Sequence, residues 1–63
     1  MCDLFVQNEG SIFLLRPLTA VGHNWIEDNL PSDAQEFGGA VVIEHRYIAA
    51  IVNGAEADGL VVE

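Results

Sequence analysis

The stretch that decides the fold is FGGAVVIEHRYIAAIVNGAEADGLVV, residues 37–62. After two glycines comes a short β-branched run, Ala40 to Glu44, which is typical of a strand. The apolar period then becomes helical, which predicts a helix from about Arg46 to Asp58. Gly59 suits the left-handed residue that ends a helix, and Leu60 to Val62 restarts an extended apolar run. This stretch therefore predicts strand, helix and strand with very short connections.

Two further extended runs stand upstream, Asp3 to Gln7 and Ser11 to Arg16. Residues 8–10 (NEG) between them match a three-residue hairpin loop with glycine at the left-handed position. Both sides of the hairpin are apolar, and a short chain has little left to cover the second side. We therefore expect a sheet face that pairs with a second copy of the chain or with a partner, and its candidate residues are Phe5, Phe13 and Leu15.

A first helix is predicted between the hairpin and the decisive stretch. Pro17 ends the second strand because it cannot donate to a strand ladder. Thr19 suits the N-cap of a helix from Ala20 to about Asn29, and Pro31 closes that helix.

Acidic residues gather at the end of this helix and in the loop after it. No Lys or Arg lies between Arg16 and Arg46. Two aromatic residues flank the acids, and they are either anchors for a partner or residues of the core. The candidate partner-binding residues are Glu27, Asp28, Asp33, Glu36, Trp25 and Phe37.

The composition restricts the class of protein. The 63 residues predict one domain, 51% of them are hydrophobic, and the net charge is −8. Direct binding to nucleic acid is disfavoured because phosphate contacts rest on clustered Lys and Arg. A partner with a basic surface is favoured, although the acids can also serve solubility alone. Cys2 is the lone cysteine and no run approaches a membrane span, so we expect a cytoplasmic protein that uses no membrane.

The sequence offers no strong constellation for chemistry. We predict no catalytic residue, no cofactor site and no metal site, because neither a nucleophile elbow nor a paired metal-ligand spacing occurs. One dense polar cluster, residues 44–47 (EHRY), stands at the strand-to-helix corner, where electrostatics at the helix end explains it better than acid-base work. A small enzyme or metal protein using His23, His45 and Glu44 is a less favoured alternative.

The pattern GSIFLLRPLT, a Trp-containing helix, DAQEFGGAVVIEHRY and a closing ADGLVV resembles a set of short uncharacterised bacterial proteins. The resemblance covers most of the chain from Gly10 onward. It implies an intracellular bacterial, phage or mobile-element origin and assigns no role to any residue.

We therefore predict a single α+β domain, residues 1–63, in which a β-hairpin is followed by α-β-α-β and two helices cover one face of a small mixed sheet. The favoured function is a non-enzymatic acidic interaction module, an accessory factor or inhibitor that forms a homodimer. The alternative is a nucleic-acid mimic that blocks the basic groove of a DNA- or RNA-binding protein.

Overall fold

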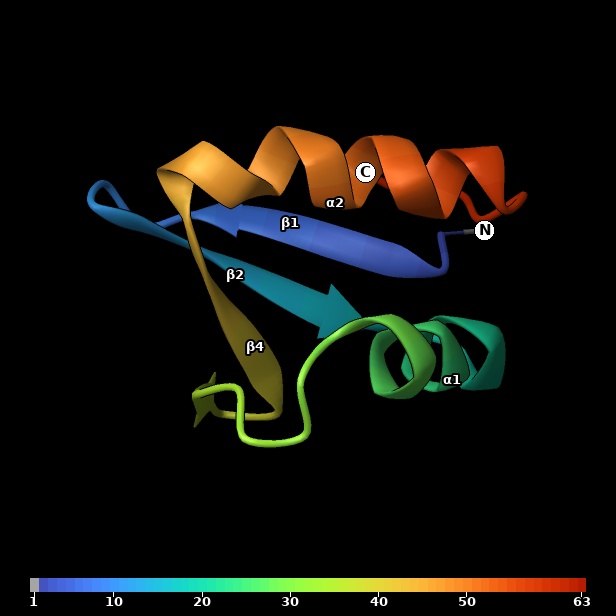
Figure 1. Ribbon diagram of the computed structural model, residues 1–63, viewed down its shortest axis with the longest axis horizontal. Helices are drawn as coiled ribbons and strands as arrows, with labels where there is room; N and C mark the ends of the chain where they lie inside the picture. Colours follow the sequence, from blue (N-terminus) through green and yellow to red (C-terminus); the bar gives the residue numbers. More distant parts are fainter. Residues whose placement is uncertain (1) are drawn as a thin grey trace.

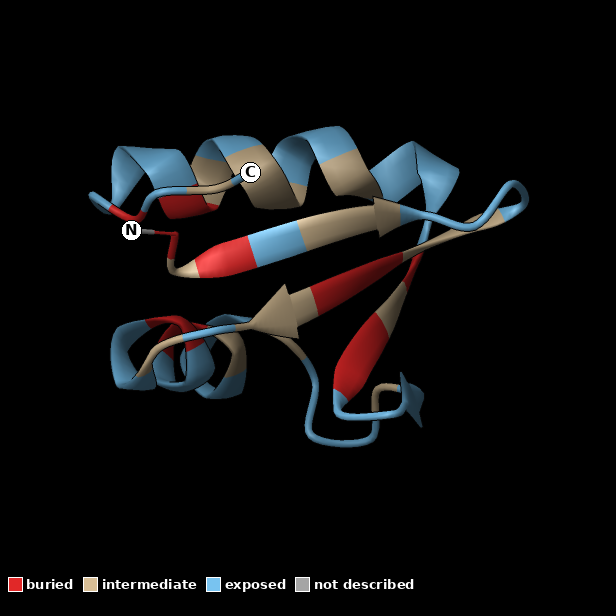
Figure 2. Ribbon diagram, turned by 180° about the vertical axis from the view of Figure 1, so that it is seen from behind, coloured by how far each residue is buried: buried red, intermediate tan, exposed pale blue. Residues whose placement is uncertain are grey.

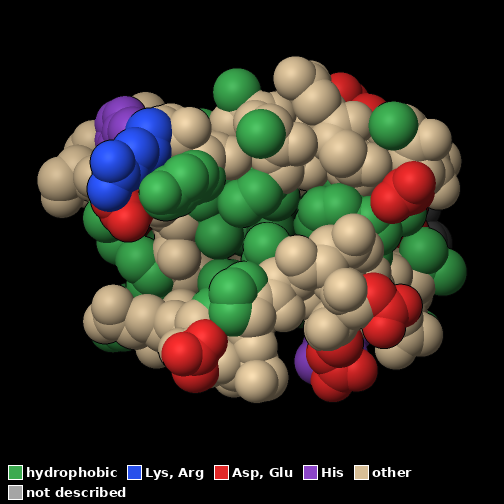
Figure 3. Space-filling view, in the orientation of Figure 1, with side chains coloured by type: hydrophobic (Ala, Val, Ile, Leu, Met, Phe, Trp, Pro, Cys, Tyr) green, Lys and Arg blue, Asp and Glu red, His purple; other side chains and the backbone are tan. Residues whose placement is uncertain are grey.

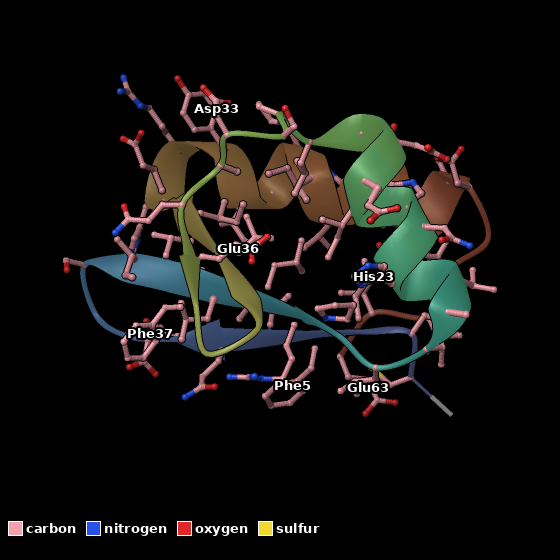
Figure 4. All side chains as sticks on the ribbon, turned by 90° about the horizontal axis from the view of Figure 1, so that it is seen from below. Phe5, His23, Asp33, Glu36, Phe37 and Glu63 are labelled. Carbon is pink, nitrogen blue, oxygen red and sulfur yellow. The ribbon has the colours of Figure 1, made fainter. Side chains whose placement is uncertain are left out.

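The computed structural model describes residues 2–63 and shows an antiparallel sheet of four strands in the order β1-β2-β4-β3 (Figure 1). Both helices lie on one side of this sheet (Figure 4). The predicted α+β class is therefore confirmed. The elements in chain order are β1 (Leu4–Asn8), β2 (Ile12–Pro17), α1 (Ala20–Asn29), β3 (Glu36–Phe37), β4 (Ala40–Glu44) and α2 (His45–Ala57).

Two hairpins build the sheet, and glycines form both turns. Gly10 has a φ of 89° in the turn between β1 and β2, as the sequence predicted. Gly38 and Gly39 have φ values of 58° and 83°, and two consecutive positive φ values suit the tight turn that joins β3 to β4. The sequence did not predict β3, because a two-residue strand carries no alternation.

The register of the first hairpin differs from the expected one. Val6 lies opposite Leu15, and Asn8 lies opposite Phe13. A three-residue loop over residues 8–10 would instead place Gln7 opposite Ser11, so that odd-numbered residues pair with odd ones and even-numbered residues with even ones. An odd shift between strands turns every side chain of one strand to the other face. The prediction that Phe13 and Leu15 share an uncovered face with Phe5 is therefore wrong.

The core lies between the sheet and the helices. Leu4 and Leu15 are fully buried at its centre, and the buried positions fall on β1, β2, β4 and one side of each helix (Figure 2). Phe13 packs against this cluster while remaining partly exposed. The buried cluster consists of Leu4, Leu15, Trp25, Val41, Ile43, Ala55 and Leu60.

Both helices begin and end close to their predicted limits. The Thr19 hydroxyl accepts a hydrogen bond of 3.1 Å from the Gly22 backbone N–H, which caps α1. Gly59 has a φ of 91° just after α2. Within residues 2–63, no helix is long and apolar enough to cross a membrane.

The segment after α2 runs beside β1. It forms one isolated parallel bridge, between Leu4 and Val62, in place of the predicted strand over residues 60–62. The Val61 carbonyl accepts from the Asp3 and Leu4 backbone N–H groups at 2.9 and 3.1 Å. This segment therefore covers the β1 edge of the sheet, which is otherwise antiparallel throughout the described chain.

Candidate interaction surfaces

The predicted acidic residues are all exposed but do not form one continuous row. Glu27 lies on α1 and forms an i,i+4 pair with His23, at 3.2 Å between Nε2 and Oε1. Glu27 and Glu36 line the same hollow, which neither Asp28 nor Asp33 lines. Figure 3 shows the carboxylates on the helix face as separate patches around an apolar centre. The structure therefore brings two of the four predicted acids together.

Trp25 is a core residue. It is buried, with 9% of its surface exposed, and its indole N–H donates a 2.7 Å hydrogen bond to Asp58 Oδ2. This bond joins α1 to the end of α2. The core interpretation of Trp25 is confirmed, so this side chain is not available as an anchor for a partner.

Phe37 is an exposed residue of β3. Its side chain is 69% exposed, the highest value among the large hydrophobic residues of the described chain. Phe37 pairs with Ala40, whose neighbour Val41 points into the core under the helices. Since side chains alternate along a strand, Ala40 and Phe37 lie on the side of the sheet that no helix covers. Figure 4 shows Phe37 and Phe5 together on this side, and Phe5 is 41% exposed.

We call this surface the open sheet face. A hollow of about 420 Å³ lies on it beside Phe37 and is lined further by Ile12, Leu14 and Val42. Arg16 is the cation of this face, and its guanidinium donates a 2.7 Å hydrogen bond to the Gly38 carbonyl. The hollow on the open sheet face is therefore mainly apolar, with Glu9, Ser11 and Gln35 as its polar lining, and the positive charge of the face is held at the β3–β4 turn.

A second apolar surface lies on the helix side. One wall belongs to α2, the opposite wall to the segment directly after α1, and the floor to β4 (Figure 3). Its volume is about 320 Å³. This α2 groove could not be predicted from the sequence, because it depends on how α2 and the loop are spaced over β4. Its main lining residues are Leu30, Pro31, Ala34, Val41, Ile43, Tyr47, Ala50 and Ile51.

The polar corner at residues 44–47 divides into two sets of contacts. Arg46 Nη2 lies 3.3 Å from Glu44 Oε1, and the guanidinium carbon lies 5.1 Å from the centre of the Tyr47 ring. His45 turns toward the first hairpin, where Nε2 lies 2.6 Å from the Gly10 carbonyl oxygen. Since a carbonyl only accepts, Nε2 carries the proton. Arg46 therefore joins Glu44 and Tyr47, whereas His45 makes a separate contact with the first hairpin.

Asp3 is a structural residue that the sequence did not single out. Its carboxylate accepts from the Val61 backbone N–H at 3.0 Å and from the Thr19 hydroxyl at 2.7 Å. These hydrogen bonds, first that of Val61 and then that of Thr19, lower the pKa of Asp3 below its ordinary value. Asp3 thus links the start of α1 to the segment after α2.

Comparison with protein-family models, curated proteins and solved structures finds no match to this chain. Among residues 2–63, no three His, Cys, Asp or Glu side chains come together in a way that could hold a metal ion. The surfaces themselves are therefore the basis for a functional proposal.

Proposed function

We propose that the protein is a non-enzymatic interaction module that forms a homodimer through the open sheet face and binds a second protein with a basic surface. The observation that carries this proposal is the exposure of Phe37 beside an apolar hollow on that face. Apolar patches that remain exposed on a folded chain are typical of protein interfaces.

The geometry suits a twofold arrangement. In a twofold interface the same patch serves both subunits, so a projecting group must meet a recess of the same face. Phe37 supplies the projecting group, and Ile12, Leu14 and Val42 lie in the neighbouring hollow. Aromatic side chains that enter such recesses are frequent centres of binding energy. Two copies can therefore each place Phe37 against the hollow of the other.

The charge supports a basic partner. The net charge is −8, and both arginines are held by contacts within the chain, Arg16 at Gly38 and Arg46 at Glu44. Charge of one sign accelerates encounter with surfaces of the opposite sign. We therefore expect the second partner to carry clustered Lys and Arg.

Sedimentation equilibrium tests the dimer. The wild type is expected at twice its chain mass of 6.8 kDa, and Phe37→Ser at the mass of one chain. Val21→Ser is the matched control, because Val21 is 57% exposed on α1 and lies outside the open sheet face. A wild type that sediments as a monomer at every concentration would refute self-association.

Capture of proteins from a bacterial lysate by the immobilised chain tests the second partner. Basic proteins are expected to bind at low salt and to be released as salt rises. Failure to retain any protein at low salt contradicts this part of the proposal. Release of the captured protein by duplex DNA would instead favour the nucleic-acid mimic.

A further inference from the structure

We propose that the α2 groove is the docking site for a basic amphipathic segment of the partner protein. The apolar side chains of this segment enter the groove, and its Lys and Arg residues face the acidic rim formed by Glu27, Glu36 and Glu44. This inference rests on the proposed function and specifies where and how the partner binds. It does not depend on the homodimer.

The chemistry of the lining favours apolar side chains as occupants. Walls and floor consist of Leu, Ile, Val, Ala and Pro side chains, and Glu44 is the one charged residue among those that line the groove. Sites for polar small molecules hold several polar groups aimed at the ligand. The groove has the Tyr47 hydroxyl and the Glu44 carboxylate near one end, so it is suited to hydrocarbon along most of its length.

The shape favours a segment over a single side chain. A second hollow of about 320 Å³ adjoins the groove and shares four lining residues with it. This hollow adds Ile26, Glu27, Ser32 and Glu36 to the surface. The combined depression therefore extends from Tyr47 on α2 to Glu27 on α1. Amphipathic segments bind along elongated depressions of this kind by placing several apolar side chains in a row.

The charges at the rim select a basic segment. Glu44 lies at one end of the depression, and Glu27 and Glu36 lie toward the other. Arg46 is the nearby cation, and it is already engaged by Glu44 and by the Tyr47 ring. The rim is thus negative overall, and Lys or Arg residues on either side of an apolar stripe complement it.

The same charges argue against a second copy of the chain as the occupant. A second copy has only Arg16 and Arg46 as Lys or Arg residues, and both are engaged in contacts of their own. It therefore offers no clustered cations to the Glu27, Glu36 and Glu44 carboxylates at the rim. The open sheet face, which holds Arg16, lies on the opposite side of the sheet. The two surfaces can therefore bind different partners.

The test selects ligands from random peptides of about 15 residues displayed on phage, with the full chain immobilised at low salt. Selected peptides are expected to carry apolar residues at helical spacing and net positive charge. Fluorescence anisotropy then compares variants at two neighbouring exposed alanines of α2, one lining the groove and one outside it. Ala50→Arg is expected to weaken binding by about tenfold or more, and Ala49→Arg by less than about twofold.

Neutralising the rim provides a second measurement. Glu36→Gln is expected to weaken binding and to reduce its salt dependence, whereas Glu56→Gln, which alters an exposed acid outside both hollows, is expected to change neither. Three results would overturn the inference: no enriched peptide, equal affinity for Ala50→Arg and wild type, or a change of assembly mass in Ala50→Arg. The first two results leave the expected effect of Phe37→Ser on the homodimer unchanged, so in those cases the docking proposal fails by itself, whereas the third would place the contact between copies in the groove.

Discussion

Two glycines inside the helices should respond in opposite ways to replacement by alanine. Alanine is favoured over glycine in a helix interior by about 1 kcal/mol, so sequence propensity alone predicts that Gly22→Ala and Gly54→Ala both stabilise the protein. The structure distinguishes them by what a new methyl group would meet. This pair therefore tests how closely α1 approaches the start of β1.

At Gly22 the methyl group has no room. It would overlap the Asp3 carbonyl oxygen and lie 3.0 Å from the carbonyl carbon and 3.2 Å from Leu4 Cδ2. Overpacking typically destabilises by 1–3 kcal/mol, and the upper end applies because a backbone carbonyl cannot rotate away. The helical preference for alanine offsets about 1 kcal/mol of this, so Gly22→Ala should lower the free energy of unfolding by about 2 kcal/mol. This change lowers Tm by about 8–16 °C in a domain of this size.

At Gly54 the nearest atom to the new methyl group is Trp25 Cζ2 at 3.7 Å, an ordinary contact. The helical gain then dominates, and Gly54→Ala should raise Tm by about 4–8 °C. Thermal unfolding followed by far-UV circular dichroism and by Trp25 fluorescence measures both variants. A Gly22→Ala protein as stable as the wild type would refute the close approach of α1 to Asp3, and equal losses at both sites would refute the steric argument altogether.

Three further predictions concern the contacts that join distant parts of the chain. Because the pKa of Asp3 is lowered in the folded state, its contribution to stability is present above the ordinary carboxyl pKa of about 3.9 and is lost as the pH falls through the folded value. Asp3→Asn should therefore reduce the stability at pH 7 and make stability depend less on pH toward acid, as measured by urea midpoints from pH 7 to 3. Trp25→Phe removes the indole N–H that Asp58 accepts and should lower the free energy of unfolding by about 1 kcal/mol, whereas Asp58→Asn, which keeps an acceptor, should lose less in the same urea titration. Thr19→Ala removes the cap of α1 and should lower the free energy of unfolding by about 1 kcal/mol, whereas Thr19→Ser keeps a hydroxyl and should preserve most of that stability. Equal effects of the two variants in thermal unfolding would contradict the capping role.

The local structure could be predicted because single residues determine it. Thr19 has a hydroxyl suited to capping, Gly10 and Gly59 tolerate positive φ, and the apolar period marks α2. These signals depend on neighbours along the chain. They accordingly placed the hairpin, both helices and β4.

The faces of the sheet could not be predicted in the same way. They depend on hairpin register, and the observed pairing of Asn8 with Phe13 reverses the face that a three-residue loop implies. Sequence likewise treats Trp25 and Phe37 as equivalent aromatic residues beside acids. Trp25 is buried because its ring reaches from α1 to the last turns of α2, where it lies beside Gly54 and bonds to Asp58. Phe37 is exposed because it lies on the edge strand β3, on the side of the sheet without helices. The candidate surfaces thus follow from tertiary packing.

The pairing of the last residues with β1 has a mechanical consequence. The two segments run parallel, and the Val6 N–H donates to Glu63 O at 2.7 Å while the Glu63 N–H donates to Leu4 O at 3.0 Å. A force that pulls the two ends of the described chain apart acts along these segments and perpendicular to their hydrogen bonds, so it loads the bonds together in shear instead of opening them one at a time. Pulling on the two ends must therefore break the hydrogen bonds between the last residues and β1 in one step before the sheet can unfold.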